Sequence, residues 1–280
     1  MDKGIFSKTF ATASVDENFR VMRSLGYTCT QFNFASADLP SLPDTVARSK
    51  IEEISAAVQT QDVRIAAVSA TFNMVHPQQS VIDAGMASLD VICQAAADLN
   101  CPLVTLCTGT CDAEDQWRFH PDNNTPEAWQ RLCVSMTQAL EIAERYQVAL
   151  GIEPELANIV SSAVKARQLI DEMRSERLKV IFDPANLFEI ATLSEQHRIV
   201  AHGLDLLGAE IAIAHAKDRY ADGAFATAGK GLLDYPFYLQ RLSASGFNGS
   251  IVTHGLDASE AGWVSTMLDQ QLQKLETYSC

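Results

Sequence analysis

ALGIE, at residues 149–153, is the first of four short apolar segments that each end on a carboxylate or an imidazole. The other three are VIFD (180–183), IAIAH (211–215) and IVTH (251–254). Their last residues are 30, 32 and 39 residues apart, and they are Glu153, Asp183, His215 and His254. One strand and one returning helix fit into such a spacing, so each of these side chains is expected to end a strand, one βα unit after the previous one.

The same alternation extends through the N-terminal half. Four further apolar, β-branched runs are GIFSKTF (4–10), YTCTQFNF (27–34), VRIAAVSA (63–70) and PLVTLC (102–107). Residues with helical spacing lie between the runs, and the pair Thr125-Pro126 is typical of the start of a helix. Eight strand–helix units in 280 residues predict an α/β protein, a (β/α)8 TIM barrel that forms a single domain over residues 1–280. A doubly wound sheet also alternates, but no glycine-rich turn follows the first run.

Composition is that of one ordinary globular domain, with 47% hydrophobic residues and a net charge of −14. The acidic balance argues against partners that require cationic contacts, so neither nucleic acid nor an anionic membrane is expected. No stretch is expected to approach the apolar length of a membrane span, and the N-terminus lacks a signal-like apolar run, which favours the cytoplasm. Seven cysteines without a C-x-x-C pair predict reduced thiols.

The four strand-end residues predict a metal site. In a barrel of parallel strands they would converge on one mouth, where two carboxylates and two imidazoles form a donor set for one divalent ion. Mn2+, Zn2+, Co2+, Fe2+ and Mg2+ all remain open. Any one of these residues alone could instead cap the loop that follows its strand.

The C-terminal half also resembles a known family. Glu153, Asp183 in FDPAN (182–186), His215 in HAKD (215–218) and the following GKGLLDY (229–235) are similar to the xylose isomerase-like superfamily of sugar phosphate isomerases and epimerases. The resemblance implies a barrel with a divalent metal held by Glu, Asp, His and Glu, of which His254 replaces the last. It further implies Glu153 as the catalytic base and His254 at the position of the second catalytic group.

Other polar residues are candidates for substrate binding at the same mouth. The segment 71–77 and the long loop 108–124, a candidate lid, follow the third and fourth runs, and Asn186 and Lys217 lie just beyond two of the metal-ligand candidates. Lys217 could neutralise an oxyanion or bind a carboxylate or phosphate. The loop residues could equally bond only to backbone. The full candidate set is Asn73, His76, Trp117, His120, Asn186 and Lys217.

These observations favour a metal-dependent isomerase or epimerase of a sugar or sugar phosphate, working by α-proton abstraction through an enediolate. A dehydratase of a polyhydroxylated carbonyl compound uses related chemistry and is the alternative within the enzymes. His254 favours a further alternative, a non-catalytic ligand-binding barrel. A repair endonuclease is disfavoured by six histidines in all and by the acidic charge. The expected partner is a small polyhydroxylated substrate, and a homo-oligomer is possible.

Overall fold

The protein is a closed barrel of eight parallel strands, as the sequence predicts. The structure is a computed structural model that describes residues 1–278. The strands follow one another around the barrel in the order β1-β10-β7-β6-β5-β4-β3-β2. Their bounds are β1 Asp2–Phe6, β2 Cys29–Phe32, β3 Arg64–Ser69, β4 Leu103–Leu106, β5 Ala149–Ile152, β6 Leu178–Phe182, β7 Ile211–Ala216 and β10 Ser250–Thr253.

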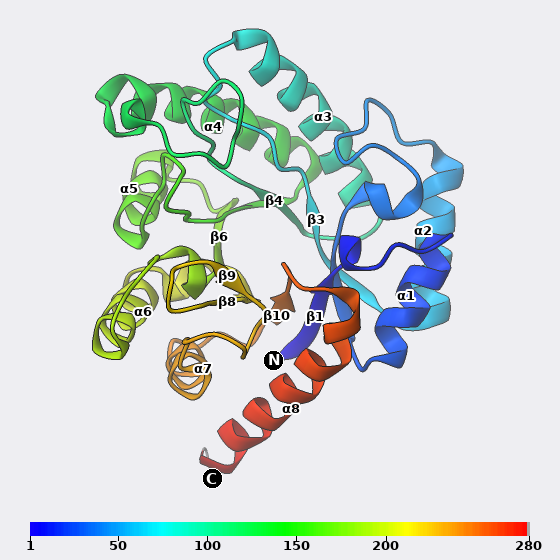
Figure 1. The fold of residues 1–280 in the computed structure, drawn as a ribbon. Coiled ribbons are helices and arrows are strands. Elements are labelled where there is room, and N and C mark those ends of the chain that lie inside the picture. Colours follow the sequence, from blue (N-terminus) through cyan, green and yellow to red (C-terminus); the bar gives the residue numbers. More distant parts are fainter. Residues whose placement is uncertain (279–280) are drawn as a thin grey trace.

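Eight α-helices surround the strands (Figure 1). They are α1 Val15–Ser24, α2 Arg48–Gln61, α3 Gln79–Asp98, α4 Pro126–Tyr146, α5 Ala163–Met173, α6 Leu193–Leu207, α7 Tyr235–Ala244 and α8 Ala261–Tyr278. Helix α4 begins as expected, because the Thr125 side chain accepts a hydrogen bond from the backbone N–H of Ala128, with Pro126 in the first turn. The fold is therefore a single-domain (β/α)8 TIM barrel.

Two apolar layers stabilise the barrel. A large cluster fills the space between strands and helices, and a smaller one, which includes Cys29, Leu103, Ile181 and Val252, fills the barrel interior. Small residues are needed inside: a Cβ on Gly4 would lie only 2.8 Å from the Cys29 sulfur. The interior is thus packed rather than open, and polar side chains gather at the carboxyl ends of the strands.

Helix α3 corrects one expectation. It is long and apolar enough, by length and composition, to cross a membrane, so the expectation that no stretch approaches a membrane span is wrong for Gln79–Asp98. Its apolar side chains, among them Leu89, Ile92 and Cys93, are buried against the barrel. The core helix of a barrel accounts for this composition.

The described cysteines are all unpaired thiols, as expected, and four of the six are buried. Burial raises the pKa of the Cys93 thiol to about 12, which is typical of an inert core residue. Cys280 lies outside the described residues.

Candidate metal centre and its cavity

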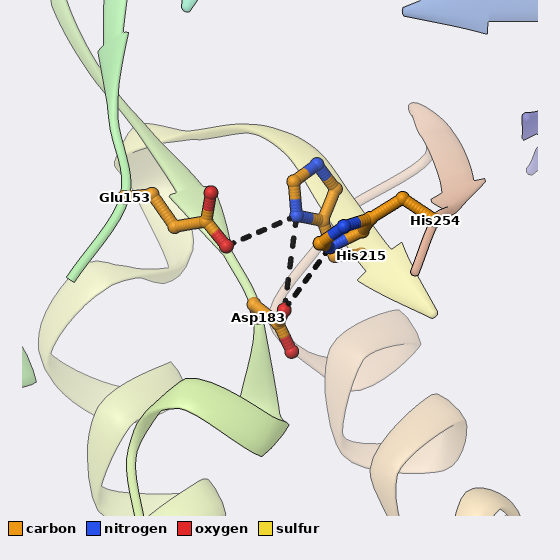
Figure 2. A group of neighbouring side chains, drawn as sticks. All are labelled: Glu153, Asp183, His215 and His254. Carbon is orange, nitrogen blue, oxygen red and sulfur yellow. Dashed lines mark hydrogen bonds and ion pairs between the residues drawn. The ribbon is translucent and has the colours of Figure 1, made fainter. Parts of the chain in front are cut away.

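The four predicted strand-end residues lie together at the mouth of the barrel. Glu153, Asp183, His215 and His254 each direct one ligand atom to a common point, and these atoms lie within 4.8 Å of one another (Figure 2). The His215 Nδ1 atom is 3.2 Å from Glu153 Oε1, and the His254 Nε2 atom is 3.3 Å from Asp183 Oδ2. The spacing read from the sequence therefore corresponds to one site in space.

The cluster has a buried inner pair and a more accessible outer pair. The side chains of Asp183 and His215 are 0% and 2% exposed, whereas those of Glu153 and His254 are 19% and 23% exposed. The outer pair lines a cavity of about 1040 Å³ together with His215. A ligand in this cavity would thus meet Glu153 and His254 before it met Asp183.

Gln31, on β2, orients His215. The Nε2 atom of His215 is 2.9 Å from Gln31 Oε1, and the Gln31 amide is itself fixed by donating to Thr105 Oγ1 at 3.2 Å. Since the amide oxygen can only accept, His215 carries its proton on Nε2 there, and Nδ1 faces the carboxylates. A carbonyl that fixes the ring of a ligand histidine is a common feature of metal sites in proteins.

Helix α7 holds the strand that carries His215. The Tyr238 hydroxyl donates to the His215 carbonyl at 3.1 Å, and the Tyr235 hydroxyl donates to the Lys217 carbonyl at 3.0 Å. Both rings are buried, so they fix the backbone at the end of β7 and just after it. Neither tyrosine was predicted from the sequence.

Opposite charges in the cluster compensate for burial. Burial opposes ionisation of Asp183, but the hydrogen bond from His254 and the charge of Lys217 hold its pKa well below the usual range. Burial likewise disfavours the charged form of His215, yet Glu153 and Asp183 raise the pKa of its imidazole. Burial and the neighbouring charge of His215 lower the pKa of His254, which favours its neutral form.

These residues fit a divalent metal ion. Two carboxylates and two neutral imidazoles carry a charge of −2, and oxygen and imidazole nitrogen are ligands that first-row divalent metals accept. The unused oxygen of Asp183 accepts the backbone N–H of Ala185 at 2.9 Å, which leaves Oδ2 directed at the cluster. Glu153, Asp183, His215 and His254 could therefore hold one ion.

Two of the predicted substrate-binding residues lie beside the cluster. Asn186 donates from Nδ2 to Glu153 Oε1 at 2.7 Å, and its Oδ1 accepts from Lys217 Nζ at 3.2 Å. Both residues line the cavity. The Asn186 amide thus links the Glu153 carboxylate to the Lys217 ammonium group.

The structure places the loop residues differently from one another. Trp117 lines the cavity and is 50% exposed. Asn73 and His76 lie outside that cavity, in a neighbouring hollow, where their side chains bond to the backbone of the loop 108–124. His120 is not among the residues lining either space, and it caps the short helix at Pro121–Asn124. Of these four residues, only Trp117 is positioned next to the metal-site cavity.

Sequence reasoning missed other residues at the site. Gln31, Glu155, Arg219 and Phe225 also line the cavity. Burial, reinforced by the charge of Glu153, raises the pKa of Glu155 to about 7. The signals available were the polar Gln31 within a buried strand and the second carboxylate in GIEPE (151–155).

The GKG segment (229–231) is held by the side chain of Asp218. The buried Asp218 carboxylate accepts the backbone N–H groups of Arg219, Gly229, Gly231 and Leu233 at 2.8 to 3.1 Å. A Cβ on Gly231 would lie 2.3 Å from both Asp218 Oδ1 and the Arg219 carbonyl oxygen. The glycine is thus required for close approach, and Asp218 fixes the loop that follows β7.

Fold and site together define a TIM barrel with a candidate divalent-metal centre at the carboxyl ends of its strands. Residues 19–269 match the xylose isomerase-like TIM barrel family, and the chain belongs to that family. A comparison with curated proteins finds no match.

Solved structures share the fold across almost the whole chain. A D-tagatose 3-epimerase-like protein is 16% identical with a TM-score of 0.79, covering 100% of both chains. The IOLI protein, solved with a bound zinc atom, is 14% identical with a TM-score of 0.73 and covers 99% of both. A probable 3-DHS dehydratase from Bacillus anthracis is 11% identical with a TM-score of 0.76, covering 96% of this chain and 99% of its own. The TM-scores establish a common fold, and identities this low establish no more than that.

Proposed function

We propose that the protein is a metal-dependent isomerase or epimerase of a small polyhydroxylated carbonyl compound, a sugar or sugar phosphate. The observation that carries the proposal is the cluster of Glu153, Asp183, His215 and His254, which lies at a cavity large enough for such a substrate. The epimerase-like structure and the zinc-containing structure that share the fold support it.

Glu153 is the proposed base. A bound divalent ion supplies a Lewis acid that polarises a substrate carbonyl and makes the neighbouring C–H more acidic. Glu153 reaches into the cavity, and the amide of Asn186 fixes its Oε1 atom at 2.7 Å. A carboxylate held in this way removes a proton from the carbon next to the carbonyl, which gives the enediolate.

His254 is the proposed second catalytic group. It is the other accessible member of the cluster, where the family resemblance implies a glutamate. Its lowered pKa favours a neutral imidazole. When this ring is not bound to the ion, it would accept a proton from one face of a substrate or return one after protonation. Epimerisation would use Glu153 and His254 from two sides, whereas isomerisation would need only Glu153.

A dehydratase is the second candidate. Glu153 and His254 are unlike groups, a carboxylate and an imidazole. Glu153 would remove a proton at one carbon, and His254, once protonated, would give a proton to the hydroxyl that leaves from the next. The probable dehydratase that shares the fold supports this reading. Water loss would distinguish it, because the product gains a conjugated C=C–C=O group that absorbs in the ultraviolet.

Solvent isotope exchange tests the proposal. The metal-loaded protein is incubated in D2O with sugars, sugar phosphates and cyclitols, and deuterium on the carbon next to the carbonyl is measured by NMR. We expect incorporation with the true substrate and its loss in Glu153→Gln, which keeps the size of the side chain but cannot act as a base. Glu176→Gln, an exposed carboxylate outside the cavity, serves as the matched control. Exchange at an undiminished rate in Glu153→Gln would refute the assigned base.

Binding without exchange and without water loss across the panel would instead favour the non-catalytic barrel. That result would refute the proposed enzyme while leaving the metal centre in place.

A further inference from the structure

Two buried cations face the cavity with little compensation from carboxylates. Lys217 and Arg219 are 7% and 8% exposed, and both line the cavity beside the metal centre. Among the described residues, no carboxylate forms an ion pair with Arg219, and the nearest to Lys217 is Asp183, with Oδ2 at 3.9 Å from Nζ. Asp183 already faces two histidines. Lys217 thus shares one distant carboxylate and Arg219 has none in contact. Because burying weakly compensated charge is costly, the arrangement favours an anion from elsewhere.

The hydrogen bonds of the two cations leave donors directed at the cavity. Arg219 donates from Nε to the Ala185 carbonyl at 2.6 Å and from Nη1 to the Gly223 carbonyl. Lys217 donates one N–H to Asn186 Oδ1. Carbonyl and amide oxygens orient the two side chains but do not neutralise them, and a guanidinium and an ammonium hold more donors than these contacts use.

A single aromatic ring brings the cations together. Phe225 lies on β9 (Phe225–Ala226), which pairs with β8 (Asp218–Arg219) as an antiparallel hairpin. The Lys217 Nζ atom is 3.4 Å from the ring centroid and the Arg219 guanidinium carbon is 4.0 Å from it. The hairpin is held by Asp218, so the two positive groups are preorganised beside one ring.

The remaining charges of the cavity do not cancel these cations by contact. The two carboxylates of the metal centre balance a divalent ion. Glu155 and Glu189 also line the cavity, and their charges act on Arg219, but neither lies within ion-pair distance of it. The wall formed by Lys217, Arg219 and Phe225 holds the buried positive charge of the cavity, whereas Lys8, which also lines it, is exposed.

We propose that this wall binds an anionic group of the substrate, a carboxylate or a phosphate. Arg219 offers a planar guanidinium and Lys217 a point charge, a combination that holds either anion. Because Lys217 lies 3.9 Å from Asp183, the anion would sit close to the carbons that react at the metal centre. The inference rests on the proposed function for the reacting carbons, and it narrows the substrate to an acidic or phosphorylated polyhydroxylated compound.

Matched ligand pairs test the inference by calorimetry on the metal-loaded protein at low salt. D-gluconate is compared with D-glucitol, and D-fructose 6-phosphate with D-fructose, so that each pair differs mainly in the anion. We expect one anionic member to bind at least tenfold more tightly than its neutral partner, and that pair identifies carboxylate or phosphate. Lys217→Met and Arg219→Gln should each reduce the preference roughly tenfold or more. Lys230→Met removes a cation that pairs with Glu260 outside the cavity, and it should leave the preference unchanged.

Equal affinity within both pairs for the wild-type protein would overturn the inference, as would a preference that survives both substitutions. Since a variant can fail to fold, the wild-type preference is also measured against added NaCl, which should weaken it if charge is the cause. A preference that does not respond to salt would also count against it. Binding needs no turnover, so the two experiments separate the two proposals. An anion preference without isotope exchange would refute the proposed enzyme and leave this inference standing. Isotope exchange without an anion preference would refute this inference and leave the proposed enzyme standing.

Discussion

Replacing Gln31 by leucine should weaken metal binding while largely preserving the fold. The Gln31 carbonyl accepts the Nε2–H of the buried His215 at 2.9 Å, which keeps the Nδ1 lone pair directed at Glu153 and Asp183. Without it, the imidazole can move its proton to Nδ1 and donate to Glu153, and the nitrogen that would bind the ion is then blocked. Loss of such an orienting contact typically costs about 10 to 100-fold in metal affinity, or about 1.4 to 2.7 kcal/mol.

The stability of the metal-free protein should fall by less than the free energy of metal binding does. The contact of His215 Nδ1 with Glu153 remains when the Gln31 amide is lost, so we expect the free energy of unfolding to fall by only about 1 kcal/mol. Affinity is measured by competition with a fluorescent zinc indicator, and stability by urea denaturation of the metal-free protein. Gln31→Glu keeps an acceptor and should bind metal nearly as well as the wild type.

Thr30→Val is the matched control for this substitution. The Thr30 hydroxyl donates to the Ile5 carbonyl at 2.7 Å and is fully buried on the same strand, without contact with the cluster. It should cost about 1 kcal/mol of stability and leave metal affinity unchanged. Wild-type affinity in Gln31→Leu would refute the orientation of His215 described above.

Three further outcomes follow from the structure. Asp218→Asn exchanges a charged acceptor of four backbone N–H groups for an amide, and urea denaturation should show a loss of about 2 to 3 kcal/mol. Metal affinity, measured by indicator titration, should rise as the pH rises through the raised pKa of His215. Glu153 favours the protonated form of the His215 ring, and only the deprotonated ring binds metal. A metal affinity that does not change from pH 6 to 9 would contradict this. Trp117→Ala should weaken binding of an identified substrate by about tenfold or more, because truncating a contact tryptophan often costs over about 1 kcal/mol of binding. His120 lies outside the cavity, so His120→Ala should not weaken binding. Equal effects of the two substitutions on the calorimetric affinity would exclude the lid.

The sign of the His215 effect also fixes how stability depends on pH. Its pKa in the metal-free folded protein is raised above the ordinary value of about 6.5. The stability that its charged form contributes is therefore fully present below that ordinary value, and it is lost as the pH rises through the folded pKa. Metal-free protein and metal binding thus respond to rising pH in opposite directions.

The metal cluster can be predicted from the sequence because barrel geometry determines where the ends of the strands lie. Parallel strands place their carboxyl ends at one mouth, so the last residues of four successive strands are neighbours once the barrel is recognised. Asn186 and Lys217 closely follow Asp183 and His215 in the sequence, so they lie at the same mouth of the barrel. Expectations on the cytoplasmic location and on a homo-oligomer stay predictions.

In loops, the position of a residue in the sequence says less about which space its side chain lines. Asn73 and His76 lie four and seven residues beyond the end of β3 at Ser69. The chain has turned toward the loop 108–124 at that point, and both side chains form hydrogen bonds with the backbone of that loop. Gln31 precedes the end of its strand, and an amide is not a usual metal ligand, so only the three-dimensional contact with His215 shows its role. Arg219 becomes part of the cavity only through the hairpin after β7.

Metal content tests the central claim most directly. The purified protein is loaded with Zn2+ or Mn2+, dialysed, and measured by inductively coupled plasma mass spectrometry, alongside Asp183→Ala and the control His197→Ala. His197 pairs with Asp234, outside the cluster. The account predicts one ion per chain in the wild type and in His197→Ala, and none in Asp183→Ala. No stoichiometric metal in the wild type, or equal metal in all three proteins, would contradict it.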